Sequence, residues 1–225
     1  MSQTVLVLEK VKVHHKLKLA VEDCILNEPF AAFVQAKLKT DTLVITCGLP
    51  ATYKTGVAEE IANMKGYPIL RSDLIRLEVL KGQDVFDTKV ASNRKNRMAV
   101  YEEMFRRAKK LAAKGGVILD ATFVKAALRR RAAEIAAKND LSLAIFETSC
   151  PQNIALDRIK NRTKENYQSN ALTKEAYLAN KNSFEPVNVD ALKQQFPNLN
   201  VAHYVVDTNV CGMSNWTIIK EERGK

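Results

Sequence analysis

The chain has 225 residues, of which 46% are hydrophobic, and a formal net charge of +10. This length suits one α/β domain with a small addition, and this composition suits a globular protein with a sizeable core. No apolar run approaches the roughly 20 residues of a membrane-spanning helix, and the four cysteines are too widely spaced for a zinc ribbon or a disulfide framework. We therefore expect a cytoplasmic protein without a secretion signal or a membrane partner.

The positive charge has two interpretations. It could mark a nucleic-acid surface, or it could reflect basic residues around an anionic site and along exposed helices. Basic residues are concentrated between residues 86 and 134, largely on helical patterns, which favours solvated helix faces. Nucleic-acid binding stays open as an alternative, although the sequence has no evident aromatic platform or zinc knuckle.

Strand and helix patterns alternate along the chain. Residues 4–13 are β-prone, and residues 19–38 follow as a helix that Asn27-Glu28-Pro29 can break. Five further strands are predicted at 43–47, 66–70, 117–120, 141–147 and 203–206. Predicted helices cover 56–64, 74–80, 94–114, 125–138, 151–162, 172–182 and 188–195.

Strands that alternate with helices predict an α/β three-layer sandwich, in which helices cover both faces of a mostly parallel five-stranded sheet. We assign residues 1–40 to an N-terminal strand and helix extension, residues 41–210 to the α/β domain, and residues 211–225 to a C-terminal tail.

The stretch Thr42–Thr55, TLVITCGLPATYKT, has the order of a phosphate-binding P-loop, the Walker A motif. An apolar strand enters a turn that starts with glycine, and the turn delivers Lys54 and Thr55 to the start of a helix. Backbone N–H groups of such a loop face an anion, Lys54 adds charge for the outer phosphates, and the Thr55 hydroxyl can hold magnesium. The other expected nucleotide-binding residues of the loop are Gly48, Leu49, Pro50, Ala51, Thr52 and Tyr53.

Tyr53 departs from the motif, because the position before the lysine is normally glycine. A left-handed backbone at a non-glycine residue costs on the order of 1–2 kcal/mol. The loop can tolerate this conformation with Tyr53 pointing outward and remain active. Alternatively, nucleotide binding is weakened and the protein works as a binder.

Polar residues follow the next two predicted strands. Arg71-Ser72-Asp73 comes after the second strand of the domain, and Asp120-Ala121-Thr122 comes after the third. Ligands of parallel α/β sheets bind at the carboxyl ends of the strands. We therefore expect these residues to face one crevice together with the P-loop.

The ordered set of motifs resembles the P-loop kinases of the polynucleotide-kinase and zeta-toxin type, the AAA-like predicted kinases. The resemblance covers residues 42–208 and is carried by GLPATYKT, RSDLIR, VILDATF, DRIKNR, NSFEPV and VVDT. It implies a P-loop NTPase or kinase fold with ATP and Mg²⁺ as cofactors, but it is specific to no substrate.

The resemblance also implies roles for residues that hold the phosphates and the metal. Lys54 would bind the β- and γ-phosphates, Thr55 would ligate magnesium, and Asp120 would serve the magnesium or its waters. The alternatives are purely structural roles: Lys54 and Thr55 could begin an ordinary helix, and Asp120 could be a helix cap or a strand-end carboxylate.

On the acceptor side, the resemblance implies that Asp73 accepts the proton of the attacking hydroxyl and that Arg76 binds an acidic group of the substrate. Arg158 and Arg162 lie four residues apart, so both can point into the site from one helix and neutralise charge during transfer. Asp73 could instead cap a helix, and the arginines could belong to solvated surfaces.

We therefore expect an ATP- and Mg²⁺-dependent kinase that phosphorylates a hydroxyl of a small metabolite or of a nucleic-acid end. A catalytically weak or inactive nucleotide-binding protein with an ATP-dependent interaction role is the alternative. The sequence specifies neither the acceptor nor the oligomeric state.

Overall fold

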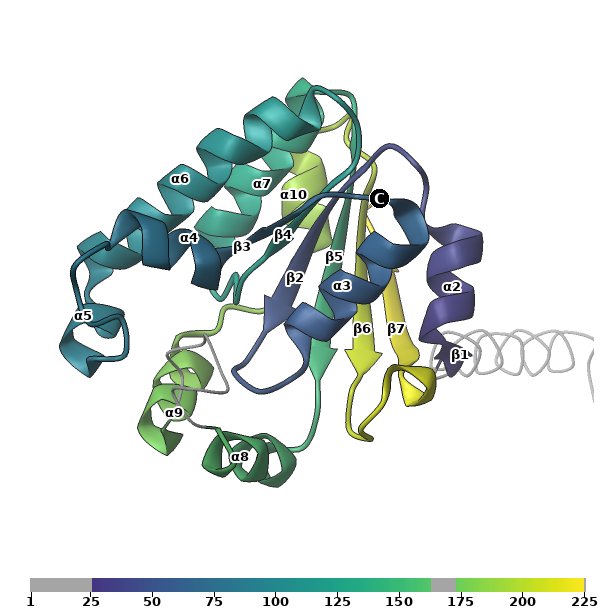
Figure 1. The fold of residues 1–225 in the computed structure, drawn as a ribbon. Helices are drawn as coiled ribbons and strands as arrows, with labels where there is room; N and C mark the ends of the chain where they lie inside the picture. Colours follow the sequence, from purple (N-terminus) through teal and green to yellow (C-terminus); the bar gives the residue numbers. More distant parts are fainter. Residues whose placement is uncertain (1–25, 163–172, 225) are drawn as a thin grey trace, which may run out of the picture.

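The computed structural model describes residues 26–162 and 173–224 of the chain (Figure 1). Within these residues, seven strands form one sheet in the order β1-β7-β6-β5-β2-β4-β3. The strands are β1 (Glu28–Pro29), β2 (Thr42–Gly48), β3 (Ile69–Arg71), β4 (Val117–Asp120), β5 (Ser142–Ser149), β6 (Val201–Asp207) and β7 (Thr217–Arg223). The helices of the same residues are α2 (Phe30–Lys37), α3 (Lys54–Lys65), α4 (Ser72–Val79), α5 (Thr88–Ser92), α6 (Arg94–Ala112), α7 (Ala126–Lys138), α8 (Gln152–Lys160), α9 (Lys174–Ser183), α10 (Val189–Gln195) and the 3-10 turn η1 (Met213–Asn215).

The predicted α/β class with a mostly parallel sheet is confirmed, but the predicted number of strands is wrong. The five expected strands pair in parallel, whereas β7 and β1 extend the β6 edge in antiparallel fashion. Strand β7 was missed because its charged half, Lys220–Arg223, has the composition of a solvated tail. Its pairing with β6 and the burial of Ile218 on the sheet define it as a strand.

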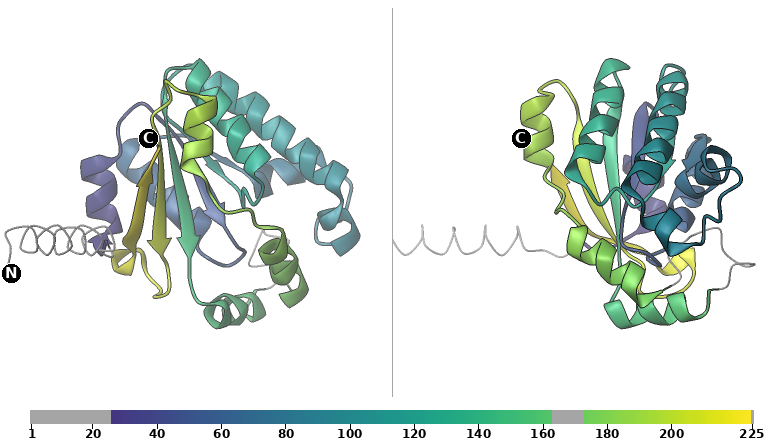
Figure 2. Two further views of the ribbon diagram at one scale, coloured as in Figure 1. Left: turned by 180° about the vertical axis from the view of Figure 1, so that it is seen from behind. Right: turned by 90° about the vertical axis from the view of Figure 1, so that its left-hand side faces the viewer.

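Strand β2 lies in the middle of the parallel strands, and all seven of its residues are buried. Its side chains alternate between the faces of the sheet, as the two-residue period of a strand requires. Leu43 and Ile45 pack in one apolar cluster with α6, α7 and α10, and Val44 packs in a second cluster with α2 and α3. The sheet is therefore covered on both faces, as Figures 1 and 2 show.

The described parts of the predicted N-terminal extension and C-terminal tail pack against the sheet. Helix α2 begins directly after Pro29, where the sequence predicted a break, and buries Phe30 and Phe33 against the sheet. From the predicted tail, Trp216 and strand β7 join the same apolar cluster and the same sheet. The strand predicted at residues 4–13 and the first part of the helix predicted at 19–38, residues 19–25, lie outside the described residues.

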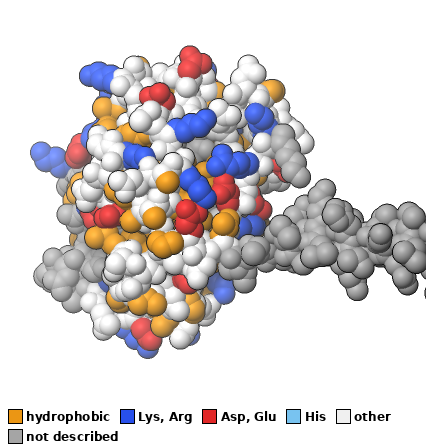
Figure 3. All heavy atoms as spheres, turned by 90° about the vertical axis from the view of Figure 1, so that its right-hand side faces the viewer, with side chains coloured by type: hydrophobic (Ala, Val, Ile, Leu, Met, Phe, Trp, Pro, Cys, Tyr) orange, Lys and Arg blue, Asp and Glu red, His pale blue; other side chains and the backbone are white. Residues whose placement is uncertain are grey.

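The surface on the α2 side carries charges of both signs. Figure 3 shows basic and acidic side chains interspersed with apolar ones on this face. Among the helices of the described residues, none has the length and apolar character of a membrane span.

Candidate active site

The turn from Gly48 to Tyr53 leads from β2 into α3, which begins at Lys54. Three residues of this turn have positive φ: Gly48 at 129°, Ala51 at 64° and Tyr53 at 59°. A Cβ on Gly48 would lie 2.7 Å from the carbonyl oxygen of Thr148, so that the first position admits only glycine. The turn is thus closely packed against the end of β5.

Tyr53 adopts the left-handed backbone that the motif normally gives to glycine. Its ring lies 5.7 Å from the Trp216 ring, and the Arg158 guanidinium lies 4.2 Å from its centroid. Its hydroxyl is 3.3 Å from the Cys211 sulfur. These contacts with the C-terminal part of the chain offset the backbone strain, and they show how the loop accommodates a bulky residue here.

Trp216 also sets the packing of the first turn of α3. A Cβ on Gly56 would lie 2.8 Å from the tip of the indole ring, and the indole itself is buried. Glycine one residue after Thr55 therefore lets the C-terminal segment pack directly behind the P-loop.

Three threonines anchor the P-loop to the ends of two strands. The Thr52 hydroxyl lies 2.6 Å from that of Thr148 and donates to the Leu49 carbonyl at 2.8 Å. The Thr208 hydroxyl donates to the Thr52 carbonyl at 3.1 Å and to that of Ser149 at 3.0 Å. These contacts were not predicted, because nothing local in the sequence joins residues 52, 148 and 208.

Lys54 is a buried cation at the centre of the site. Its ammonium group donates to the Leu49 carbonyl within the loop at 2.5 Å. Burial lowers its pKa to about 8, although the nearby Asp120 carboxylate opposes this shift; the positive charge of Arg162 adds to it. The lysine is thus held in a place where a further negative charge would stabilise it.

Asp120 ends β4 and is also buried. Its two carboxylate oxygens accept hydrogen bonds from Thr46 at 2.8 Å and from Thr55 at 2.7 Å. Burial raises the pKa of this carboxyl group, and the two hydroxyl donors counteract the shift. Thr46, a polar residue within an apolar strand, is the only sequence signal for the first of these contacts.

The candidate active site is a cavity of about 690 Å³ at the carboxyl ends of the parallel strands. The predicted site residues that line it are Pro50, Ala51, Tyr53, Lys54, Thr55, Asp73, Arg76, Asp120 and Arg162. The predicted residues Gly48, Leu49, Thr52 and Arg158 do not line it. Gly48, Leu49 and Thr52 support the loop from behind.

Asp73 and Arg76 lie on the first turns of α4, next to the end of β3. The guanidinium of Arg76 donates to the Asp73 carboxylate at 3.0 Å, and both side chains are largely shielded from solvent. The spacing of three residues places them on one face of the helix, as the sequence predicted.

The expectation that one helix directs both Arg158 and Arg162 into the site is wrong for Arg158. Helix α8 ends at Lys160, so Arg162 lies beyond it and lines the cavity. Arg158 instead donates to the carbonyl oxygens of Ala51, Thr208 and Asn209. Its side chain thereby ties the P-loop to the segment after β6.

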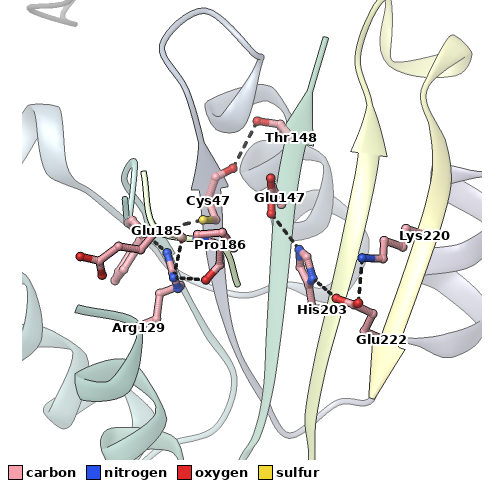
Figure 4. A network of polar contacts seen from close by, with 10 residues as sticks. Cys47, Arg129, Glu147, Thr148, Glu185, Pro186, His203, Lys220 and Glu222 are labelled. Atoms are coloured by element: carbon pink, nitrogen blue, oxygen red, sulfur yellow. Dashed lines mark hydrogen bonds and ion pairs between the residues drawn. The ribbon is translucent and has the colours of Figure 1, made fainter. Parts of the chain in front are cut away.

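A buried arginine outside the cavity connects segments next to it. Arg129 of α7 donates to the carbonyl oxygens of Phe123, Glu185 and Pro186 (Figure 4). This links the turn after β4 to the segment after α9, whose helix lines the cavity through Asn180 and Ser183. In a separate network, Figure 4 shows the His203 ring between the carboxylates of Glu147 and Glu222, which connects β5, β6 and β7.

Sequence reasoning missed several polar residues of the cavity on the side of α4, α5 and α6. They are Lys89, Ser92, Arg97 and Tyr101. The Tyr101 hydroxyl accepts the N–H of Phe123 at 3.2 Å, directly after β4. The segment 81–95 has weak periodicity, so the sequence did not indicate which of its side chains face the site.

Thr55 and Asp120 fit a magnesium site by the chemistry of their donors. Mg²⁺ prefers oxygen ligands and is commonly bound by only one or two protein groups together with substrate phosphates and water. One hydroxyl and one carboxylate meet at the P-loop, as such a site requires. No larger cluster of metal-ligating side chains occurs in the part of the chain that the structure describes.

The comparisons with known proteins agree with this geometry. A family model described as an AAA domain matches residues 43–187. The uncharacterized proteins Mb2027c of Mycobacterium bovis and Rv2004c of Mycobacterium tuberculosis are each 31% identical over 139 residues, or 59% of this chain. The chain spans only 28% of the length of these curated relatives.

Solved structures resemble the fold at low sequence identity. A gluconokinase from Sinorhizobium meliloti 1021 is 17% identical, with a TM-score of 0.50 over 76% of this chain and 84% of that one. A sugar kinase from Janibacter sp. HTCC2649 is 14% identical, with a TM-score of 0.52 over 76% and 86%. The complex AvrRxo1-ORF1:-ORF2 with ATP is 14% identical, with a TM-score of 0.53 over 96% and 66%. The family match shows that the chain belongs to this AAA-domain family, and its fold resembles that of the kinases among the solved structures.

Proposed function

We propose that this protein is an ATP- and Mg²⁺-dependent phosphotransferase that moves the γ-phosphate of ATP to a hydroxyl group. The observation that carries the proposal is that Lys54, Thr55, Asp120 and Asp73 line a single cavity at the carboxyl ends of the strands. A P-loop alone supports nucleotide binding, whereas a carboxylate across the cavity from it supports transfer to an acceptor.

The P-loop would hold the phosphates of ATP. Its backbone N–H groups and the start of α3 favour an anion, and the buried Lys54 ammonium would gain a negative partner in place of the Leu49 carbonyl. Thr55 and Asp120 would hold Mg²⁺, which when bound neutralises charge on the phosphate oxygens.

Asp73 would act as the general base. The acceptor oxygen attacks the γ-phosphorus, its proton passes to the Asp73 carboxylate, and the bond from the γ-phosphorus to the bridging oxygen breaks so that ADP leaves. Arg76 would orient this carboxylate through the hydrogen bond that the structure contains. Arg162, which lines the same cavity and whose charge acts on Lys54, would stabilise charge on the transferring group.

A phosphate-transfer screen tests the proposal. Labelled ATP is offered with sugars, sugar acids, nucleosides and 5′-hydroxyl oligonucleotides, and a sample without acceptor reports bare ATPase activity. Lys54→Ala should abolish transfer, and Asp73→Asn should lower turnover by about 10²- to 10⁴-fold. Lys110→Ala and Asp157→Asn, which remove exposed charges of the same types, are the controls. Full turnover by Asp73→Asn would show that the base is misassigned.

The left-handed Tyr53 supports a second candidate, a nucleotide-dependent binding protein without transferase activity. In that case ATP binds but no acceptor is phosphorylated, and Tyr53→Gly raises ATP affinity by relieving the loop. Calorimetric titration of ATP into both forms, beside the transfer screen, separates the two candidates.

The acceptor classes we propose are a small metabolite or a nucleic-acid end. The similar structures include a gluconokinase and a sugar kinase, which supports a small hydroxyl compound as the acceptor. This support rests on similarity of fold alone. We also propose a cytoplasmic location, which the free cysteines Cys47, Cys150 and Cys211 support.

A further inference from the structure

The wall of the cavity formed by α4, α5 and α6 is rich in cations. It includes Arg76, Lys89 and Arg97. In the sheet order, β4 and β3 separate this wall from the P-loop strand β2, and Figure 1 shows the three helices together beyond β3. The wall therefore lies on the side of the cavity where Asp73 would receive an acceptor.

The carboxylates of this wall do not balance its positive charge. Asp73 is paired with Arg76 at 3.0 Å. Lys89 and Arg97, by contrast, make no side-chain hydrogen bond or ion pair with any residue in 26–162 or 173–224. Two cations of the wall are thus available to a ligand.

The position of Arg97 on α6 directs it toward the cavity. It shares one helix face with Val100 and Tyr101, three and four residues further on, and all three line the cavity. Burial raises the pKa of the Tyr101 hydroxyl, and the charge of Arg97 is close enough to oppose that shift. Because Tyr101 accepts the N–H of Phe123, Arg97 lies near the turn that follows Asp120.

A solvated helix face is the alternative explanation for these cations. The same turn of α6 provides a direct comparison, because Arg94 and Lys95 are exposed and do not line the cavity. Arg97 is partly buried and does line it. A guanidinium that lines a cavity and has no carboxylate partner among the residues described is more typical of an anion-binding group than of a solvated one.

We propose that Arg97, assisted by Lys89, binds an anionic group of the acceptor, so that the substrate is a hydroxyl compound that already carries a phosphate or a carboxylate. This inference rests on the proposed phosphotransfer function. Arg76 remains with Asp73, and the anionic group fixes the acceptor so that its hydroxyl faces that carboxylate.

Matched pairs of compounds test the inference. Glycerol is compared with glycerol 3-phosphate, and glucose with gluconate, both as phosphate acceptors and as ligands in calorimetry with a non-hydrolysable ATP analogue bound. The anionic member of a pair should exceed its neutral partner at least about tenfold in kcat/KM or affinity. Arg97→Gln should raise the KM or Kd of the anionic member about tenfold and leave the KM of ATP unchanged, whereas Arg94→Gln should change neither.

Equal use of neutral and anionic members would overturn the inference while leaving phosphotransfer intact. Equal effects of Arg97→Gln and Arg94→Gln, or no binding of any anionic member, would overturn it as well. Binding of an anionic member that depends on Arg97, without transfer to any compound, would support the anion site and contradict the proposed transferase activity.

Discussion

Replacing Lys54 with methionine should stabilise the folded protein at neutral pH, although it removes the group that we propose binds the phosphates of ATP. The ammonium is buried, and its pKa falls from the usual 10.5 to about 8. At about 1.4 kcal/mol for each pKa unit, burial of the charged form costs the fold about 3 kcal/mol. Loss of the hydrogen bond to Leu49 offsets about 1 kcal/mol of the gain at every pH.

The sign of the pH dependence follows from the lowered pKa. Below pH 8 both folded and unfolded chains carry the Lys54 proton, so the full cost is present. Between pH 8 and 10.5 the unfolded state binds more protons at this site, and the wild-type free energy of unfolding rises relative to that of Lys54→Met. The difference between the two proteins should therefore shift by about 3 kcal/mol over this range.

Urea denaturation at several pH values from 7 to 10.5 measures this difference. The other titratable groups are present in both proteins, so their contributions to the pH dependence cancel in the difference. Lys110→Met, which removes an exposed lysine of α6, is the control for the change of residue type. A difference between wild type and Lys54→Met that stays constant across the range would refute the electrostatic reasoning.

Two further substitutions test the packing of the loop and the support of Asp120. Gly48→Ala should lower the free energy of unfolding by at least about 2 kcal/mol and abolish ATP binding, because its Cβ would meet the Thr148 carbonyl. Gly82→Ala is the control, because Gly82 also has a positive φ but its Cβ would lie in open space. An equal loss of stability in both variants would contradict the packing argument. Thr46→Val should lower the free energy of unfolding, measured by urea denaturation, by about 1–3 kcal/mol, because a buried oxygen of Asp120 loses its donor. Thr46→Ser, which keeps the hydroxyl, should retain most of the stability. Equal losses in the two variants would show that the hydroxyl contributes nothing.

The loop and the strand ends show how far sequence reasoning reached. The strand before Gly48, the helix that starts at Lys54 and the carboxylate that ends β4 were all predicted. Their signals are local: an apolar run, a glycine turn and a polar residue directly after a strand. Parallel pairing then brings strand ends to one edge of the sheet, so the convergence of Asp120 and the P-loop followed from the topology.

Arg158 and Arg162 show where sequence reasoning failed. A four-residue spacing places two side chains on one face only while the helix continues, and α8 ends at Lys160. Arg158 instead donates to carbonyl oxygens of Ala51 in the P-loop and of Thr208 after β6, both far away in sequence. Strand β7 failed for a similar reason, since a polar edge strand is defined by its partner more than by its own composition.

The sequence by itself determined the α/β class, the P-loop turn and the order of the strand-end carboxylates, because these depend on residue type and short-range periodicity. Only the tertiary structure decided how Tyr53 is accommodated, through Trp216 and Arg158, and which cations line the cavity beside α4, α5 and α6. The left-handed turn at Tyr53 is held by residues more than 100 positions away. Such contacts depend on packing between distant segments, which no local pattern specifies.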